Sequence, residues 1–398
     1  MEEDKDFSTG QDPEDGGETP SAPAGETPPD RGKDGPVRVV LDAMGGDNAP
    51  GVVIDGAIQA IQTIDAVELI LVGDEETIKS EFAKRSFENP RVSVRHAEQV
   101  VNMDDPPSVA LRRKTKSSIH TGVKMVRDGE ADAFVSAGNI GAVMAVATII
   151  LNNIEGIDRA AIAVPLPTKT GHTVLLDAGA NVVCKASHLY EFGIMGSMYA
   201  QYVLEDKLPR VGLLSIGEED VKGNETTREA FEMLTKSSIN FIGNVEAKLL
   251  YRGVAEVAVC DGFTGNIALK ISESVAEMIS ESLKNMFKGS LRGKIGYLFL
   301  RPLLNDFKKR IDHAEVGGAP LLGINGAVFI SHGSSGPKSI RSAVLGAKKF
   351  IVEDVNGHIR ESLASDKDIL LSRKRRDGIW NQMKRKIGFS DDEEAEGK

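Results

Sequence analysis

Short apolar runs alternate with stretches of helical periodicity through most of the chain. Residues 37–41, 67–72 and 210–215 are apolar runs of strand length, whereas residues 50–64 place their apolar side chains at helical spacing. Strands that alternate with helices are typical of a mostly parallel sheet with flanking crossover helices. The pattern therefore predicts an α/β fold. The other predicted strands are residues 92–95, 131–135, 160–164, 173–176, 241–242, 254–259 and 327–330.

One segment breaks this alternation. Residues 271–312 contain no strand-like run and predict two helices around a Gly-punctuated loop, inserted into the α/β body as a protruding helical hairpin. From Lys284 to Arg310 the segment has eight basic residues and one acidic residue, with apolar residues between them. That mixture suits an anionic membrane surface or an acidic partner protein. Packing against a second copy of the chain is the alternative, and the two interpretations are compatible. The candidate membrane contacts are Leu298, Phe299, Leu300, Leu303, Leu304, Arg292 and Lys294.

The net charge of −11 comes from the two ends of the chain. Residues 1–36 carry −8 and residues 389–398 carry −4, which leaves +1 on residues 37–388. Both acidic ends have few large apolar residues, so we expect them to be disordered and the folded body to span residues 37–388. A near-neutral body has no nucleic-acid-binding signature, so we expect no nucleic-acid partner.

Cysteine usage and hydropathy indicate the compartment. The only cysteines, Cys184 and Cys260, have neither disulfide nor metal-site spacing, which favours a reducing cytosol. The start of the chain has no apolar signal region, and the longest apolar run, around residues 140–151, is too short to cross a bilayer. No metal-ligand cluster or nicotinamide fingerprint stands out. We therefore expect a cytoplasmic protein that uses neither a metal nor a cofactor.

Five of the apolar runs end in loops rich in Gly, Asn, Ser and Asp. Loops at the carboxyl ends of parallel strands line ligand clefts, and the N–H groups at the helix starts that follow them bind anions. Each loop alone is an ordinary connector, but together they predict a site for phosphate or another oxyanion. The loops are residues 42–47, 136–142, 216–224, 261–266 and 331–336.

Three residues of these loops are the candidate catalytic groups. His332 places an imidazole beside Gly and Ser, which suits acid–base chemistry or oxyanion binding. Asn139 offers an amide and Lys222 a positive charge. The ordinary alternatives are a structural histidine, an Asn/Gly turn and a surface ion cluster. The candidate phosphate or substrate contacts are Ser117, Ser118, Lys116, Gly138, Asn181, Asn224, Gly333, Ser334 and Ser335. For the two serines at 117 and 118, a helix cap on a basic turn is an equally good interpretation.

Taken in order, these loop sequences closely resemble those of the bacterial phosphate acyltransferase family, PlsX. The matching segments run from residue 37 to about residue 350 in the order that the family shows them. They are residues 41–50, 116–119, 132–142, 177–181, 217–224, 241–246, 261–266, 317–323 and 332–335. Residues 182–185 and Val316 depart from the family pattern.

The resemblance implies an activity and an assembly. It implies transfer of a long acyl group from acyl-carrier protein to inorganic phosphate, which gives an acyl phosphate for phospholipid synthesis. It also implies a homodimer of the fold shared by isocitrate and isopropylmalate dehydrogenases and phosphotransacetylase. Peripheral membrane attachment through the hairpin at residues 271–312 is implied as well.

The chemistry of that reaction needs no covalent enzyme intermediate. Phosphate is already a nucleophile, so the enzyme has only to hold it against a thioester carbonyl and stabilise the oxyanion. Cys184 and Cys260 have no adjacent His and are interpreted as buried thiols. Two alternatives stay open: a phosphotransacetylase-like enzyme that uses acyl-CoA, and a non-catalytic membrane or carrier-protein scaffold.

Overall fold

A computed structural model describes residues 35–289, 291–311, 318–366 and 369 of the chain. Residues 291–293 and 305–311 are described as helix only. The predicted acidic tail at 389–398 and nearly all of the predicted extension at 1–36 lie outside the described residues. The predicted end of the body at residue 388 does as well.

The larger of two sheets has seven strands. Five neighbouring strands are parallel, the sixth pairs antiparallel with the fifth, and the seventh pairs antiparallel with the sixth. In spatial order the strands are β3 (Val92–His96), β2 (Val67–Gly73), β1 (Val37–Asp42), β4 (Ala133–Ser136), β12 (Ala327–Ile330), β11 (Ala319–Leu322) and β5 (Ala161–Ile162). The inner strands are apolar and buried on both sides, as expected for a sheet covered on both faces.

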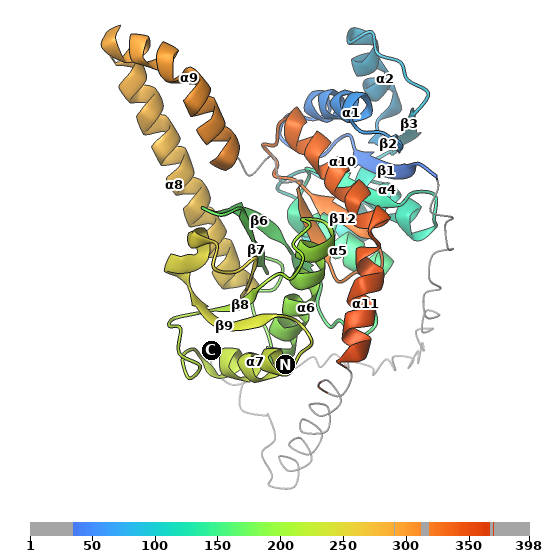
Figure 1. Cartoon of the computed structure of the whole chain (residues 1–398). Helices are drawn as coiled ribbons and strands as arrows, with labels where there is room; N and C mark the ends of the chain where they lie inside the picture. Colours follow the sequence, from blue (N-terminus) through green and yellow to red (C-terminus); the bar gives the residue numbers. More distant parts are fainter. Residues whose placement is uncertain (1–34, 290, 312–317, 367–368, 370–398) are drawn as a thin grey trace, which may run out of the picture.

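Helices cover both faces of this first sheet (Figure 1). One face packs against α1 (Gly51–Thr63), α2 (Glu75–Lys84) and α10 (Pro337–Val352), and the other against α4 (Ser118–Arg127) and α5 (Ile140–Leu151). The short helix α3 (Pro107–Arg113) packs on α5. The carboxyl ends of β1, β4 and β12 therefore emerge together at one edge, where three of the predicted loops begin.

The second sheet has five strands and shares a central helix with the first. Its order is β6 (Val164–Pro167), β7 (His172–Leu176), β10 (Val257–Val259), β8 (Val211–Ser215) and β9 (Phe241–Glu246), with only β6 antiparallel. Helices α6 (Ala186–Tyr202) and α7 (Glu225–Thr235) cover one face. Fourteen of the 17 residues of α6 are buried, because α6 also packs on α10 and on α11 (Val355–Ser365). A helix that is buried all round belongs to a core, and α6 joins the two halves of the body.

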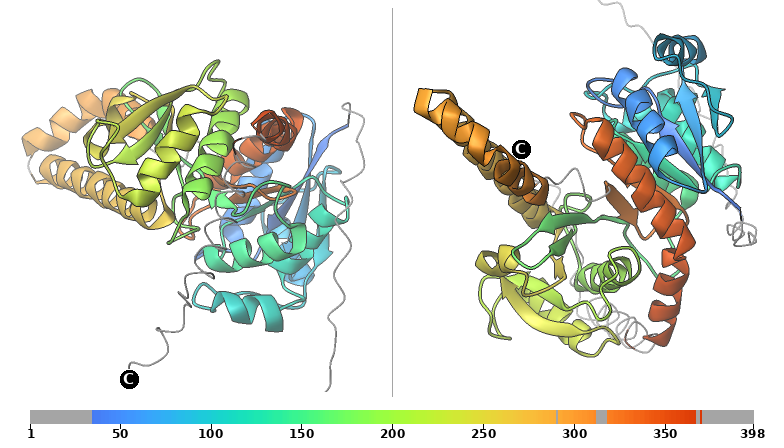
Figure 2. Two further views of the ribbon diagram at one scale, coloured as in Figure 1. Left: turned by 90° about the horizontal axis from the view of Figure 1, so that it is seen from below. Right: turned by 45° about the horizontal axis from the view of Figure 1, so that its top comes forward.

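A helical hairpin stands clear of the body. It consists of α8 (Gly262–Lys288) and α9 (Leu291–Ile311), which pack on each other (Figures 1 and 2). The first turns of α8 pack on the second sheet, and Phe287 near its other end contacts Tyr297 of α9 with ring centroids 5.8 Å apart. The hairpin is thus rooted in the second sheet and free along its outer length.

The α/β prediction is confirmed, with three differences in detail. The run at 160–164 forms two short strands, β5 and β6, that belong to different sheets. The strand β11 was not predicted, because a Pro and preceding glycines hide it. Helix α8 begins at Gly262, nine residues before the predicted hairpin, since Asp261 caps it by accepting from Thr264 N at 2.8 Å.

Candidate active site

A buried carboxylate holds the loops after β1 and β4 together. Asp42 is 2% exposed and accepts hydrogen bonds from Ser136 Oγ at 2.7 Å, Met44 N at 3.2 Å and the hydroxyl of Ser118. Burial raises the pKa of Asp42, and these hydrogen bonds act in the opposite direction. One side chain therefore links the end of β1, the end of β4 and the start of α4.

Close backbone contacts in this cluster require glycine. A Cβ added to Gly45 would lie 2.5 Å from Asp42 Oδ2 and 2.7 Å from the Gly138 nitrogen. Gly138 N donates to Ser136 Oγ at 3.0 Å. The loop after β12 joins the same cluster, because Asp47 N donates to the Gly333 carbonyl at 2.9 Å. Three strand-end loops are thus brought together, as the parallel sheet predicts.

Asn139 is committed to protein partners. Its Oδ1 accepts from Ala142 N at 3.0 Å and so caps α5. Its Nδ2 donates to the carbonyls of Asn102, Met103 and Asp105 at 3.2, 3.0 and 2.9 Å. The side chain therefore fastens the segment before α3 to the loop after β4, which is a positioning role.

The basic turn before α4 also makes its contacts with protein groups. Ser117 Oγ accepts from His120 N at 3.4 Å and caps α4, and both Ser117 and Ser118 are buried. Lys116 Nζ pairs with Glu98 at 2.9 Å on the surface. The two serines were interpreted either as phosphate contacts or as a helix cap, and the geometry matches the cap. Ser117 caps α4, and Ser118 donates to Asp42.

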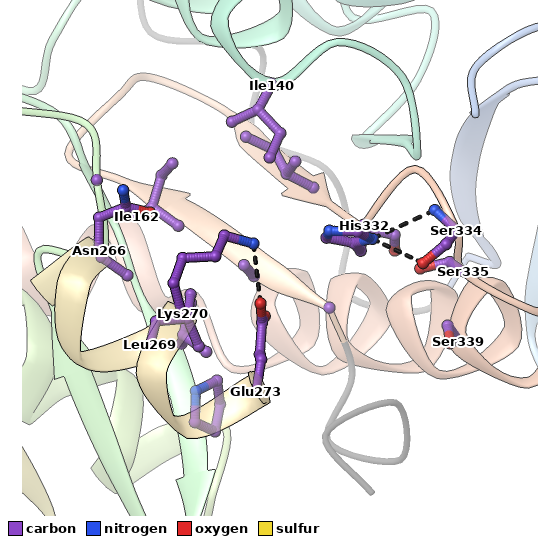
Figure 3. A pocket seen from close by; sticks show the side chains of 18 of the residues that line it. Ile140, Ile162, Asn266, Leu269, Lys270, Glu273, His332, Ser334, Ser335 and Ser339 are labelled. Atoms are coloured by element: carbon purple, nitrogen blue, oxygen red, sulfur yellow. Dashed lines mark hydrogen bonds and ion pairs between the residues drawn. The ribbon is translucent and has the colours of Figure 1, made fainter. Parts of the chain in front are cut away.

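A cavity of about 540 Å³ opens beside this cluster, where the two sheets and α8 meet (Figure 3). One part of its wall is apolar and includes side chains of both sheets, α5 and α8. The apolar lining includes Ile140, Ile162, Val164, Leu269 and Ile330, and the polar lining includes Asn266, Lys270, Glu273, His332, Ser334 and Ser335. An elongated ligand with an apolar body and a polar end matches such a wall.

The loop after β12 supplies the polar end of the cavity. Ser334 Oγ lies 2.8 Å from His332 Nδ1, and Ser334 N donates to the same nitrogen at 3.3 Å. Nδ1 is therefore the acceptor, and in the neutral ring the proton sits on Nε2, a tautomer assigned from these contacts. Helix α10 starts directly behind this loop at Pro337, so its positive N-terminal end also faces this region.

Only some of the loop residues that follow the strands of the second sheet line the cavity. Ala178 and Gly179 line the cavity, while Asn181 Nδ2 donates to the Ala160 carbonyl at 2.7 Å and to Asp177 at 3.0 Å. Asn224 caps α7 by accepting from Thr227 N at 2.9 Å. Lys222 belongs to the exposed loop before α7 and is absent from the cavity lining.

Of the predicted site residues, the cavity brings together His332, Ser334 and Ser335. Gly138 and Gly333 lie in the adjoining loops. The side chains of Asn139, Ser117, Ser118 and Asn181 support the loops instead. The contribution of α8 was not predicted, although residues 266, 270, 273 and 277 follow helical spacing directly after the loop at 261–266.

Neither thiol faces this cavity. Burial raises the pKa of Cys184 to about 11 and raises that of Cys260 well above its usual value. Cys260 is buried, and its Sγ lies 3.6 Å from the Asp177 carbonyl. Both thiols are therefore poor nucleophiles at neutral pH.

Within the described residues, no three His, Cys, Asp or Glu side chains group as they would around a metal ion. No helix in the described part of the chain combines the length and apolar character needed to cross a bilayer.

Two solved structures share this fold. A phosphotransacetylase from Streptococcus pyogenes matches with a TM-score of 0.56 and 19% identity, over 79% of this chain and 93% of that one. The EutD phosphotransacetylase from Staphylococcus aureus matches with a TM-score of 0.52 and 16% identity, over 79% and 94%. At this identity the likeness concerns the fold alone.

Relatives with similar sequences identify the family as well as the fold. A family model described as fatty acid synthesis protein matches residues 37–358. The phosphate acyltransferase of Geobacter sp. (strain M21) is 48% identical over 327 residues, which cover 82% of this chain and 93% of that protein. The phosphate acyltransferase of Pelotomaculum thermopropionicum is 47% identical over 329 residues, covering 83% and 96%. This chain therefore belongs to the phosphate acyltransferase family, and it is an acyltransferase.

Proposed function

We propose that this enzyme transfers a long acyl group from acyl-carrier protein to inorganic phosphate, which gives an acyl phosphate for phospholipid synthesis. The observation that carries the proposal is the cavity itself. Its aliphatic wall suits an acyl chain, and the loop of His332, Ser334 and Ser335 at its polar end suits phosphate and a developing oxyanion. The names of the relatives in the family support phosphate as the acceptor.

In the proposed mechanism, phosphate bound at the loop after β12 attacks the thioester directly. A phosphate oxygen forms a bond to the carbonyl carbon, the carbonyl π electrons move onto oxygen, and collapse of that intermediate breaks the C–S bond. The thiolate leaves and takes a proton. We assign His332 Nε2–H as the donor to the oxyanion or to the leaving sulfur, and the use of Nδ1 as an acceptor from Ser334 supports this assignment.

Two physical effects supply the acceleration. Holding phosphate against the carbonyl contributes at most roughly 7–11 kcal/mol by orientation. Each donor aimed at the oxyanion contributes on the order of 3–4 kcal/mol. Neither effect needs an enzyme nucleophile, and the raised pKa values of Cys184 and Cys260 fit a mechanism without an acyl-enzyme.

The direct test mixes purified protein, palmitoyl-carrier protein and phosphate, and traps acyl phosphate with hydroxylamine. A parallel reaction with palmitoyl-CoA separates the carrier-protein donor from the acyl-CoA donor of a phosphotransacetylase-like enzyme. Hydroxamate formed only with palmitoyl-carrier protein and phosphate together supports the proposal. Preference for palmitoyl-CoA favours the alternative donor, and no hydroxamate with either donor favours the non-catalytic scaffold.

Peripheral membrane attachment through the hairpin is also proposed. Leu298 and Phe299 on α9 are 68% and 77% exposed, and Leu300, Leu303 and Lys294 are exposed beside them. Leu304 is half-buried, and the side chain of Arg292 lies outside the described residues. Apolar insertion together with about 1 kcal/mol from each basic residue near an anionic surface gives reversible binding. An acyl phosphate is an amphiphile, so release beside a bilayer keeps its chain out of water.

A homodimer is proposed through the other helix of the hairpin, α8. An exposed apolar stripe recurs every three or four residues along α8, which places it on one helix face. The stripe consists of Phe263, Ile267, Ile271, Val275 and Met278. It starts where α8 is rooted in the body, so a second copy of the chain is the occupant that we assign to it. Ile267→Asp together with Ile271→Asp should shift the protein to monomers in analytical ultracentrifugation.

A further inference from the structure

A second face of α8 turns charged side chains toward the cavity. Asn266, Lys270, Glu273 and Glu277 recur at spacings of four, three and four residues, and all four line the cavity. Figure 3 shows Lys270 and Glu273 reaching into it from α8, with His332, Ser334 and Ser335 across from them. The polar end of the cavity is thus faced by a cation and an acid from the hairpin.

The cation and the acid are paired with each other. Lys270 Nζ lies 2.8 Å from Glu273 Oε2. The Lys270 side chain is 52% exposed and that of Glu273 is 30% exposed. Ion pairs this accessible to water contribute little to stability, because solvent screens them and competes for both partners. The pair can therefore open without disturbing the fold.

The charges around the cavity give Lys270 a specific importance. Among the described residues that line the cavity, it is the sole lysine or arginine, whereas Glu273 and Glu277 are acids. Phosphate bound at the serine loop would be repelled by both carboxylates unless a cation turned to face it. The serine hydroxyls and the partial positive charge at the start of α10 are weaker than a full cation, so Lys270 is the side chain of the lining best suited to offset that repulsion.

We propose that Lys270 binds the phosphate group of the substrate, and that Glu273 is the partner it exchanges for that phosphate. The inference rests on the proposed function, because it assigns the acceptor's cation within the same cavity. Before phosphate binds, Glu273 forms an ion pair with Lys270. When phosphate binds to Lys270, this ion pair breaks. Lys270 lies on α8 and outside the glycine-rich loops, so the positive charge proposed to bind phosphate comes from the hairpin helix.

The exchange makes two substitutions act in opposite directions. Lys270→Gln removes the cation and should raise the KM for phosphate by about tenfold or more. Glu273→Gln removes both the competing partner and a repelling charge, and should lower that KM severalfold. If the pair only held the helix in place, both substitutions would weaken the enzyme in the same sense. In the double variant the gain from Glu273→Gln should vanish.

The experiment measures initial rates against phosphate concentration for these three variants and the wild type. Lys79→Gln is the matched control, since Lys79 is an exposed lysine 2.5 Å from Glu75 on α2, away from the cavity. Its KM should stay unchanged, and thermal melting should confirm that every variant is folded. A Lys270→Gln variant with the wild-type KM, or KM values raised in both single variants, would overturn the inference.

Calorimetric titration with inorganic phosphate separates this inference from the proposed function. It needs no turnover, so it reports on Lys270 even if the wild type fails to make acyl phosphate. Phosphate affinity lowered by Lys270→Gln and raised by Glu273→Gln supports the inference. Wild-type protein that binds no phosphate, or affinities unmoved by both substitutions, contradicts it.

Discussion

Two sets of loops at the same edge of the first sheet share a composition and differ in where their polar atoms go. At the ends of β1 and β4, the side chains of Asp42, Ser136 and Asn139 are buried and form hydrogen bonds with protein groups. After β12, His332 and Ser334 are exposed to the cavity and bond mainly to each other. The first set is a closed scaffold, and the second is open to a ligand.

The difference teaches how a glycine- and serine-rich loop should be interpreted. A buried polar group must find partners within the protein, and once it has them it has little left for a substrate. A polar group at a cavity wall keeps donors available. Sequence composition reports the donors that a loop contains, but burial decides which of them a ligand can use.

The comparison is tested most strongly at His332. His332→Ala should lower turnover by roughly 10²-fold or more, because it removes the donor proposed to serve the oxyanion or the leaving group. The free energy of unfolding should change little, since the side chain is exposed. Steady-state kinetics and urea denaturation read the two effects separately. Near-normal kinetics in a folded variant would make His332 a structural residue.

The opposite pattern is expected at Asp42. Asp42→Ala leaves the Ser118 and Ser136 hydroxyls and the Met44 N–H without their acceptor in a buried place. At about 1–3 kcal/mol for each unsatisfied group, the free energy of unfolding should fall by about 3 kcal/mol or more. Urea denaturation measures the loss. If Asp42→Ala destabilises the protein no more than His332→Ala does, the distinction between scaffold and open loop is wrong.

The hairpin adds a third kind of surface, exposed and apolar. Changing Leu298, Phe299 and Leu300 together to Ser should release the protein from anionic vesicles and leave soluble turnover within about twofold of the wild type. The control changes Leu208, Ile216 and Val221 to Ser, because these apolar side chains are also well exposed and lie on the body instead of the hairpin. Co-sedimentation measures binding. A hairpin variant that still sediments as the wild type does would assign this surface to protein packing.

The smallest effect is expected at the thiols. Replacing Cys184 and Cys260 together by Ala should leave turnover within about tenfold of the wild type, because no chemical step is assigned to them. Burial already raises the pKa of both groups, so neither is a ready thiolate at neutral pH. Mass spectrometry that finds an acylated, chemically competent cysteine would contradict direct attack by phosphate.

The sequence predicts most of the sheet and part of the site. Apolar runs such as residues 37–41 and 327–330 predict β1 and β12, because a strand buried on both faces is apolar along nearly its whole length. His332, Ser334 and Ser335 were predicted together because one short loop carries all three. Local patterns of this kind survive in the fold unchanged.

What the sequence does not predict depends on contacts between distant segments. Asn139 bonds to the carbonyls of Asn102, Met103 and Asp105, more than 30 residues away, so its commitment to the scaffold has no local signal. Lys270 reaches the cavity because the start of α8 packs on β7 and borders the same cavity as β5 and β6. The spacing of residues 266 to 277 shows that they share a face, but packing alone decides what that face meets.

Helix α8 runs without interruption from the cavity wall to the turn of the hairpin, and its two ends are held very differently. At the root, a Cβ on Gly265 would lie 1.9 Å from the Asp177 carbonyl oxygen, so this turn is clamped against the second sheet. At 1.5 Å per residue, Lys270 lies roughly 7 Å from that clamp and Lys288 roughly 35 Å from it. A rod pivoting at its clamped end moves Lys270 about one fifth as far as it moves the tip. A pivot that moved the tip by several ångströms would therefore shift the cavity wall by about one, so the position of Lys270 depends little on what the tip of the hairpin contacts.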